Sequence, residues 1–234
     1  MSRENFLHEE NLLADQQKND EYLDLCNKEL ARDDKNADAL LHKSSCLIRL
    51  KKPEDAIACC DKILDGDAFF IGDIELSTAF TLDNKGYALS LLGKFEDALE
   101  YHEKALVIDD KNEKTFVNKA LALGGLGKYE DSLKNSEHAI SINQNYAKAW
   151  NNAGYALHKL GKSEDGLEYV EKALELDPTD KDPLDSKHVI LEALGRTDYD
   201  YTAIIENIPY VKMNTPNNIM IFDNVPNCIY VLRV

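Results

Sequence analysis

The sequence has no long apolar run, and its first residues are charged. No window of the 234 residues approaches the roughly 18 consecutive apolar residues that a membrane-spanning helix needs. The opening stretch, MSRENFLHEENLLADQQ, carries several acids and lacks the apolar centre of a secretory signal. We therefore expect a cytoplasmic protein that has no membrane partner.

Clusters of basic residues are also missing. The chain has 27 Lys and Arg against 43 Asp and Glu, and the resulting net charge of −16 repels the phosphates of nucleic acids. No run of Lys and Arg opposes this trend. Glycine (11) and proline (6) are too few for a low-complexity chain, and 44% hydrophobic residues is ordinary for a folded one. We expect a folded protein that does not bind nucleic acid.

Cysteine occurs in an odd number and without the CxxC spacing of zinc sites. The five cysteines are Cys26, Cys46, Cys59, Cys60 and Cys228. This pattern favours free thiols in a reducing compartment over a disulfide framework. His42 and Cys46 are four residues apart, but two ligands do not complete a metal site. Because no Ser–His–Asp order, phosphate-binding glycine loop or carboxylate pair stands out either, we expect no metal, no cofactor and no enzyme activity.

One sequence motif occurs three times in the chain. Residues 84–94 read NKGYALSLLGK, residues 118–128 read NKALALGGLGK and residues 152–162 read NAGYALHKLGK, with starts 34 residues apart. A fixed period of this length is typical of stacked structural units. Such a stack buries a continuous core without being compact.

Each repeat contains two predicted helices. With Trp150 as the fourth position, the units start at Ala79, Glu113 and Ala147. Apolar residues recur at helical spacing on both sides of Gly161, and the equivalent Gly93 and Gly127 also lie where a first helix must end and turn. Small residues let the two helices approach closely, and these are Gly86, Ala120 and Gly154 in the first helices and Ala98, Ser132 and Gly166 in the second.

At these positions the chain resembles the tetratricopeptide repeat proteins, whose 34-residue pattern is matched by WNNAGYALHKLGKSEDGLEYVEKALELDP. The resemblance implies an all-α, right-handed superhelical solenoid of antiparallel helix pairs. It extends to a unit from residue 37, which has Lys51 where glycine is expected, and to a weaker unit from residue 3. Because the starts at 37 and 79 are 42 residues apart, eight extra residues lengthen the loop or the following helix. We expect AFF at 68–70, within this insertion, to fold back onto the stack.

The repeat domain is predicted to cover residues 1–196. Its last element is a capping helix from about residue 181, in PLDSKHVILEALGR. Residues 197–234 leave the pattern and form a C-terminal extension. Within it, IMIF at 219–222 and CIYVL at 228–232 flank the turn-rich DNVPN, which predicts either a small β-hairpin or disorder.

The resemblance also implies a concave groove, into which positions 2, 5, 6, 9, 12 and 13 of each unit point. Position 6 is Asn84, Asn118 and Asn152 in the three well-matched units. A carboxamide can donate to a backbone carbonyl and accept from a backbone N–H, so a ladder of them can hold an extended peptide of any sequence. It is similar to the asparagine ladder of the O-linked N-acetylglucosamine transferases, which binds the peptide backbone of protein clients. The other candidate peptide-binding residues are Tyr87, Tyr155, His158, Lys114 and Lys148.

Two expectations accompany this ladder. Asn is a worse helix former than Ala by about half a kcal/mol, and no local gain is evident, so changing all three to Ala should leave the melting temperature nearly unchanged. Repeat duplication could equally have passed on an Asn that has no use in binding. The charges assigned to the groove are mixed and favour no strongly charged client; they are Asp38, Asp83, Asp182 and Asp185 against Arg49, Lys114, Lys148 and Lys159.

The sequence thus predicts a non-catalytic protein–protein interaction scaffold that binds an extended peptide or protein segment. The alternative is a structural module that forms a homo-oligomer through its end helix, the AFF insertion or its C-terminal runs, and in a third variant residues 197–234 lie in the groove. Capture of chaperone C-terminal carboxylates is not expected, because Asp83 stands where a cation should hold the carboxylate.

Overall fold

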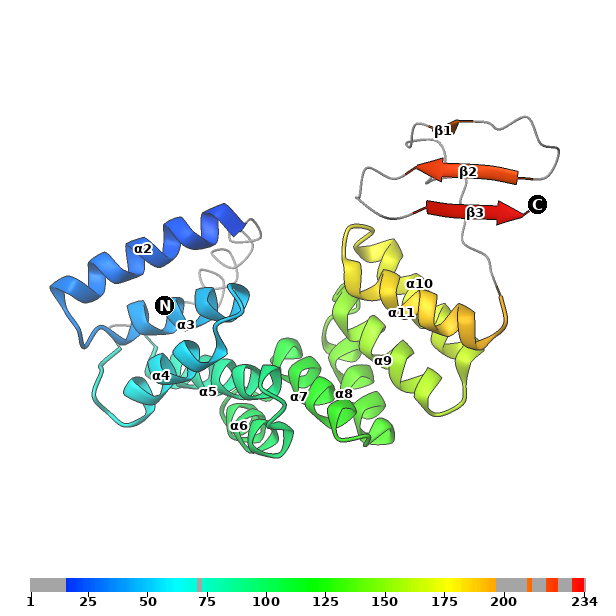
Figure 1. The fold of residues 1–234 in the computed structure, drawn as a ribbon. Helices are drawn as coiled ribbons and strands as arrows, with labels where there is room; N and C mark the ends of the chain where they lie inside the picture. Colours follow the sequence, from blue (N-terminus) through cyan, green and yellow to red (C-terminus); the bar gives the residue numbers. More distant parts are fainter. Residues whose placement is uncertain (1–15, 71–72, 197–209, 212–217, 223–228, 234) are drawn as a thin grey trace. The chain divides into compact units, whose positions relative to one another are not determined.

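The structure is a computed structural model that describes residues 16–70, 73–196, 210–211, 218–222 and 229–233 (Figure 1). The chain divides into two compact units, Met1–Ile190 and Leu191–Val234. The first unit contains the repeats. No helix among the described residues has the length and apolarity needed to cross a membrane.

The described part of the first unit is helical. Its elements are α2 (Gln16–Arg32), α3 (Ala37–Arg49), α4 (Pro53–Leu64), α5 (Ile74–Leu91), α6 (Phe95–Ile108), α7 (Glu113–Gly125), α8 (Tyr129–Ile142), α9 (Ala147–Lys159), α10 (Ser163–Leu176) and α11 (Lys181–Ala193), which continues into the second unit. Asparagine or aspartate caps start three of the first helices: Asn36 accepts from the Ala39 N–H at 3.0 Å, and Asp73 and Asn112 act likewise.

The helices form pairs that follow one another in chain order (Figure 1). The pairs are α3 with α4, α5 with α6, α7 with α8 and α9 with α10. The first helices also contact each other, α3 with α5, α5 with α7 and α7 with α9, so they make one continuous wall. This arrangement confirms the predicted all-α solenoid of helix pairs.

Small residues allow the close packing within a pair, as predicted. A Cβ atom built on Gly154 would lie 2.7 Å from the Gly166 carbonyl oxygen, and one built on Gly166 would lie 2.6 Å from that of Gly154. The backbones of α9 and α10 therefore touch where neither residue has a side chain. In the preceding pair, the Ser132 hydroxyl donates to the Ala120 carbonyl at 2.8 Å.

The insertion between the second and third units lengthens both the loop and the helix. The loop runs from Asp65 to Asp73, and α5 has 18 residues where α3, α7 and α9 have 13. Ala68 is buried in the core, and Phe70 packs against that core, as expected of a segment that folds back. Phe69 differs, because 66% of its surface is exposed.

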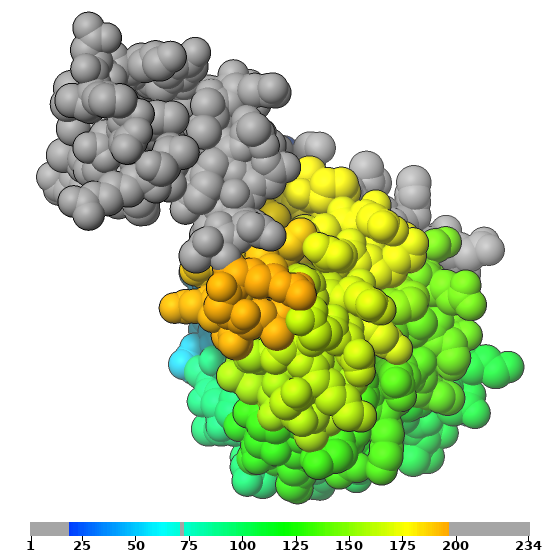
Figure 2. Space-filling view, turned by 90° about the vertical axis from the view of Figure 1, so that its right-hand side faces the viewer, coloured from blue at the N-terminus to red at the C-terminus, as the bar shows by residue number. Residues whose placement is uncertain are grey.

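Other helices lie at the ends of the array. At the C-terminal end, α11 covers the predicted capping segment, and its Ile190 is fully buried. Lys187 forms a 2.8 Å ion pair with Glu171 of α10, and Figure 2 shows the two helices together at this end of the unit. At the other end, α2 packs on α3, and the start of the weak unit from residue 3 lies outside the described residues.

The second unit contains three described strands. They are β1 (Tyr210–Val211), β2 (Asn218–Phe222) and β3 (Ile229–Arg233), in the order β1-β2-β3 with antiparallel pairing. Strands β2 and β3 correspond to the two β-favouring runs of the sequence, and Phe222 pairs with Ile229. Of the two alternatives predicted for these runs, a β-hairpin or disorder, the structure contains paired strands.

Four cysteines of the first unit are free and buried, namely Cys26, Cys46, Cys59 and Cys60, while Cys228 lies outside the described residues. Burial raises the pKa of the Cys26 and Cys60 thiols to about 12 and that of Cys46 to about 11. These thiols stay protonated at neutral pH and act as small apolar groups in the core.

The turn after each first helix has one backbone geometry, and Lys51 adopts it without being glycine. Gly93, Gly127 and Gly161 have φ of 74°, 72° and 81°, and Lys51 has φ of 56°. In each turn the N–H of this residue donates to the carbonyl of the residue three positions earlier. The N–H of the following residue donates to the carbonyl five positions earlier, as from Lys52 to Leu47 at 2.8 Å. The left-handed geometry is thus imposed by the turn, and a side chain at this position strains it.

We expect Lys51→Gly to raise the free energy of unfolding by about 0.5–1 kcal/mol, because glycine removes the Cβ strain of the left-handed backbone. Urea unfolding followed by circular dichroism measures this. Gly127→Lys is the matched reverse change, since nothing lies within 4 Å of a Cβ built there, and it should lower stability by a similar amount. Equal stability of all three proteins would contradict the strain at Lys51.

Candidate functional site

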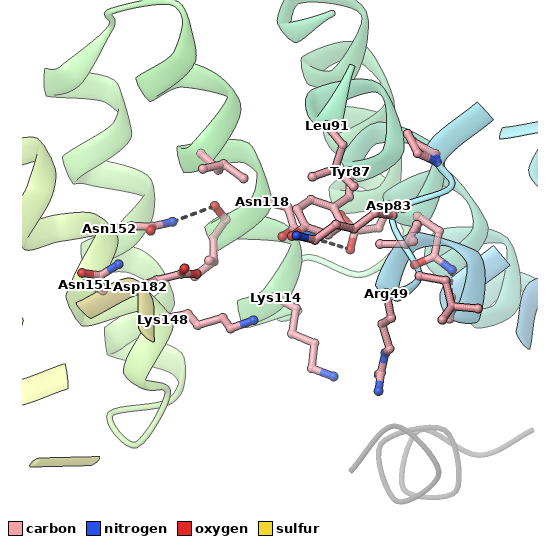
Figure 3. A pocket seen from close by; sticks show the side chains of 18 of the residues that line it. Arg49, Asp83, Tyr87, Leu91, Lys114, Asn118, Lys148, Asn151, Asn152 and Asp182 are labelled. Atoms are coloured by element: carbon pink, nitrogen blue, oxygen red, sulfur yellow. Dashed lines mark hydrogen bonds between the residues drawn. The ribbon is translucent and has the colours of Figure 1, made fainter. Parts of the chain in front are cut away.

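A groove of about 1050 Å³ runs along the wall of first helices (Figure 3). Residues of α2, α3, α5, α7, α9 and α11 line it. Six of the eight candidate binding residues lie in this lining, namely Asn84, Asn118, Asn152, Tyr87, Lys114 and Lys148. The remaining two, Tyr155 and His158, do not.

Each ladder amide is bonded to the first helix of the preceding unit. Asn84 Nδ2 donates to the Ser44 and Ser45 hydroxyls, both at 2.9 Å. Asn118 Nδ2 donates to Asp83 Oδ2 at 3.0 Å, and Asn152 Nδ2 donates to the Val117 carbonyl at 3.4 Å (Figure 3). The expectation that these asparagines have no local gain is therefore wrong: they connect neighbouring units, which one sequence repeat by itself cannot show.

The same hydrogen bonds determine which atom of each carboxamide remains available to the groove. Each Nδ2 donates to the preceding first helix. The Oδ1 atom of each carboxamide makes no hydrogen bond to any residue that the structure describes, so it remains available as an acceptor. Both Nδ2 hydrogens of Asn84 are in use, whereas Asn118 and Asn152 each retain one. The ladder thus offers the groove mainly hydrogen-bond acceptors.

Two further asparagines belong to the groove lining. Asn19 of α2 and Asn151 of α9 line it, with 5% and 8% of their surface exposed. Their Oδ1 atoms are buried and accept no hydrogen bond within the described ranges. A buried acceptor without a donor is unfavourable by about 1–3 kcal/mol, and because these two oxygens are covered by neighbouring atoms they are not offered to the groove.

A buried polar pair lies beneath the middle of the groove. His102 of α6 is fully buried, and its Nδ1 lies 2.8 Å from Asp83 Oδ1. The imidazole ring occupies the space over Gly86, where a Cβ atom would lie 2.7 Å from the ring. Since the other oxygen of Asp83 accepts from Asn118, this pair joins α6, α5 and α7 in one network.

Charged and apolar residues lie on opposite edges of the groove. Figure 3 shows Arg49, Lys114 and Lys148 along one edge and Leu91 on the other, with Asn118, Asn152 and Asp83 between them. Leu91 and Leu121 expose 46% and 43% of their surface, unusually much for leucine side chains that face a groove. Burial, and then the nearby Asp182 and Asp83 carboxylates, raise the pKa of Tyr87, so its phenol is neutral and can donate.

The two candidates outside the groove have local roles. Tyr155 is 37% exposed, and the Lys159 ammonium lies 5.0 Å from the centre of its ring. His158 Nδ1 lies 3.0 Å from the Ser163 hydroxyl, and burial, followed by the Lys159 charge, lowers the pKa of His158. Of the charges assigned to the groove, Asp38, Asp185 and Lys159 also lie outside its lining.

Several lining residues were missed in the sequence analysis. Asn151, Leu121 and Leu91 occupy positions 5, 9 and 13 of their units, so the position rule of the family could have found them. Asn19 carries no such signal, because the unit that contains it is degenerate. As for metals, no group of three or more possible ligands occurs in the described part of the chain, and His42 packs its ring against Tyr22 at 5.7 Å.

Comparison with known sequences and structures agrees with this architecture. Sequence models of the tetratricopeptide repeat family match residues 36–111, 113–146 and 147–180. The chain belongs to the tetratricopeptide repeat family. A search of curated proteins by sequence finds no match.

Two solved structures illustrate the likeness. The crystal structure of MamA shares 20% sequence identity over 67% of this chain and 86% of its own, with a TM-score of 0.53. That of YrrB, a tetratricopeptide repeat protein with an unusual peptide-binding site, shares 20% identity over 76% of this chain and 88% of its own, with a TM-score of 0.52. Both show a common fold.

We expect Asn118→Ala to lower the free energy of unfolding by about 1–3 kcal/mol, because it leaves a buried oxygen of Asp83 without its donor. Asn152→Ala should lower it by less than about 1 kcal/mol, since its bond is long and ends on a backbone carbonyl. Urea unfolding gives both values.

Asn135→Ala is the control for this comparison. Asn135 is partly exposed on α8 and its amide donates within its own helix, to the Asp131 carbonyl, so Ala should leave stability unchanged or raise it by about 0.5 kcal/mol. If Asn118→Ala proves as harmless as Asn135→Ala, the amide does not connect the units.

Proposed function

We propose that this chain is a non-catalytic scaffold that holds an extended segment of a partner protein in the groove of its first helices. The observation that carries the proposal is the column of three carboxamide oxygens, from Asn84, Asn118 and Asn152, along one continuous groove. An extended segment has a main-chain N–H at every residue except proline, so it can donate to such a column whatever its side chains are.

The chemistry of the groove supports binding over catalysis. The paired imidazole and carboxylate of His102 and Asp83 resemble two of the three members of a catalytic triad, but His102 is fully buried and does not line the groove. A general base must reach the proton that it removes, and this ring cannot. A cytoplasmic location is part of the proposal, since the four buried free thiols suit a reducing compartment.

A photo-crosslinking amino acid in place of Leu121 tests this proposal. Leu121 lies in the groove with 43% of its surface exposed, so the probe should capture a partner protein from a lysate of the source cells. The same amino acid in place of Val107, which is 86% exposed and outside the groove lining, is the control and should capture little. Equal capture at both positions would contradict binding in the groove.

Self-association is the second candidate function, and Phe69 is the observation that favours it. Its side chain is 66% exposed, yet its backbone is fixed, since its N–H donates to the Lys35 carbonyl at 2.9 Å and its carbonyl accepts from Ala37 at 3.2 Å. A large apolar group held rigidly in solvent is suited to a contact between two copies.

Light scattering on a size-exclusion column distinguishes this candidate. If Phe69 forms the contact, the wild-type mass should rise with concentration, and Phe69→Glu should restore the monomer mass. The mass of a single copy at every concentration would exclude self-association. A crosslink from position 121 with the mass of two copies would instead favour it.

A further inference from the structure

We propose that the segment held in the groove is acidic on one side and apolar on the other, with Asp or Glu alternating with apolar residues along an extended chain. This inference rests on the proposed function. It follows from how charge, amides and apolar surface are distributed across the groove.

The first step is the charge of the lining. Four cations, Arg49, Lys51, Lys114 and Lys148, line the groove against two carboxylates, Asp83 and Asp182. The lining therefore has a formal excess of two positive charges in a chain whose net charge is −16. Cations gathered in a groove of an acidic protein raise the local concentration of anionic groups.

The second step concerns Asp83, which on charge alone opposes an acidic ligand. Its two oxygens are already engaged, one with His102 and the other with Asn118. Hydrogen bonds to both oxygens reduce what the carboxylate presents to a ligand. The expectation of a groove that favours no charged client counted four acids and four cations, and two of those acids, Asp38 and Asp185, lie outside the lining, as does one cation, Lys159.

The third step is the spread of the cations. Arg49 belongs to α3, Lys114 to α7 and Lys148 to α9, so the positive charges form a row along the array. A row fits several carboxylates carried by successive parts of one segment better than it fits a single terminal carboxylate. The long, flexible lysine side chains can follow carboxylates whose spacing differs from the roughly 8–10 Å between packed helices.

The fourth step places the apolar residues. The exposed Leu91 lies on the edge of the groove opposite the cations, and the acceptor oxygens lie between the two edges (Figure 3). A main chain that donates to these oxygens lies along the middle. Because successive side chains of an extended chain point to opposite sides, one set would meet the cations and the other would meet the edge that carries Leu91. Acidic and apolar residues in alternation satisfy both edges.

Fluorescence polarisation with four synthetic probes tests the inference on the full chain. Each probe has about eight residues, which span about 26 Å when extended, and has a blocked N-terminus and an amidated C-terminus. The four sequences are Glu alternating with Leu, the same residues in two blocks, Lys alternating with Leu, and Gln alternating with Leu. We expect the alternating Glu probe to bind at least about tenfold more tightly than the other three.

Charge reversal within the groove provides the second arm. Lys148→Glu should weaken the alternating Glu probe by about tenfold, because it removes one cation of the row and adds a repulsive charge. Lys28→Glu makes the same change of charge at an exposed position of α2 outside the groove lining, and it should leave binding unchanged within about twofold.

Each other outcome overturns a defined part of the inference. Equal binding of the Gln or Lys probe removes the acidic requirement, and equal binding of the block probe removes the two-sided arrangement; the proposed groove function survives both. Tight binding that appears only when the probe has a free C-terminal carboxylate points to capture of a chain end instead. If no probe binds while position 121 still crosslinks a partner, the ligand class is wrong; if neither occurs, the proposed function fails as well.

Discussion

The hydrogen bond from an asparagine amide to the preceding first helix is the interaction on which the groove depends. It fixes the rotation of each carboxamide, with the nitrogen toward the neighbouring unit and the oxygen toward the groove. One side chain therefore serves both the stack and its inner surface. Because the interior of a solenoid is made of nearest-neighbour contacts, the proposed ligand binding would be coupled to stability at these positions, and a change at a ladder residue would alter both.

The first well-matched unit shows how one repeat can depart from its pattern and still fit the array. Positions 5 and 24 are Asp83 and His102 in this unit, whereas they are Val117 and Ser136 in the next and Asn151 and Val170 in the last. The imidazole fills the space that Gly86 leaves open, and the carboxylate becomes the acceptor for Asn118. The ionisable residues at these two positions therefore form a hydrogen-bonded network in space, in which only His102 Nε2 is buried without a partner among the described residues.

Features that obey local backbone rules could be predicted from the sequence. The turn glycines, the close pair of Gly154 and Gly166 and the capping helix follow from positions within one repeat. The spacing of the units predicted the extra residues before or within α5 but left open whether the loop or the helix takes them. Features that depend on contacts between units could not. The direction of each carboxamide is set by a residue about 35 to 40 positions away, as in the bond from Asn118 to Asp83, with |i−j| of 35. Lys51 is an intermediate case. Its position in the repeat predicts a left-handed φ, whereas a lysine by itself does not suggest one.

The placement of Tyr155 and His158 illustrates the limit of a position rule. Both occupy groove positions of the family, yet neither belongs to the groove lining, and their side chains instead contact Lys159 and Ser163. The position rule has the same limit for charged residues, because the charge of a groove depends on which charged residues share its surface. At physiological salt a charge acts over about 8 Å, so the row of Arg49, Lys114 and Lys148 would act on the proposed ligand more than the distant acids that set the net charge of −16.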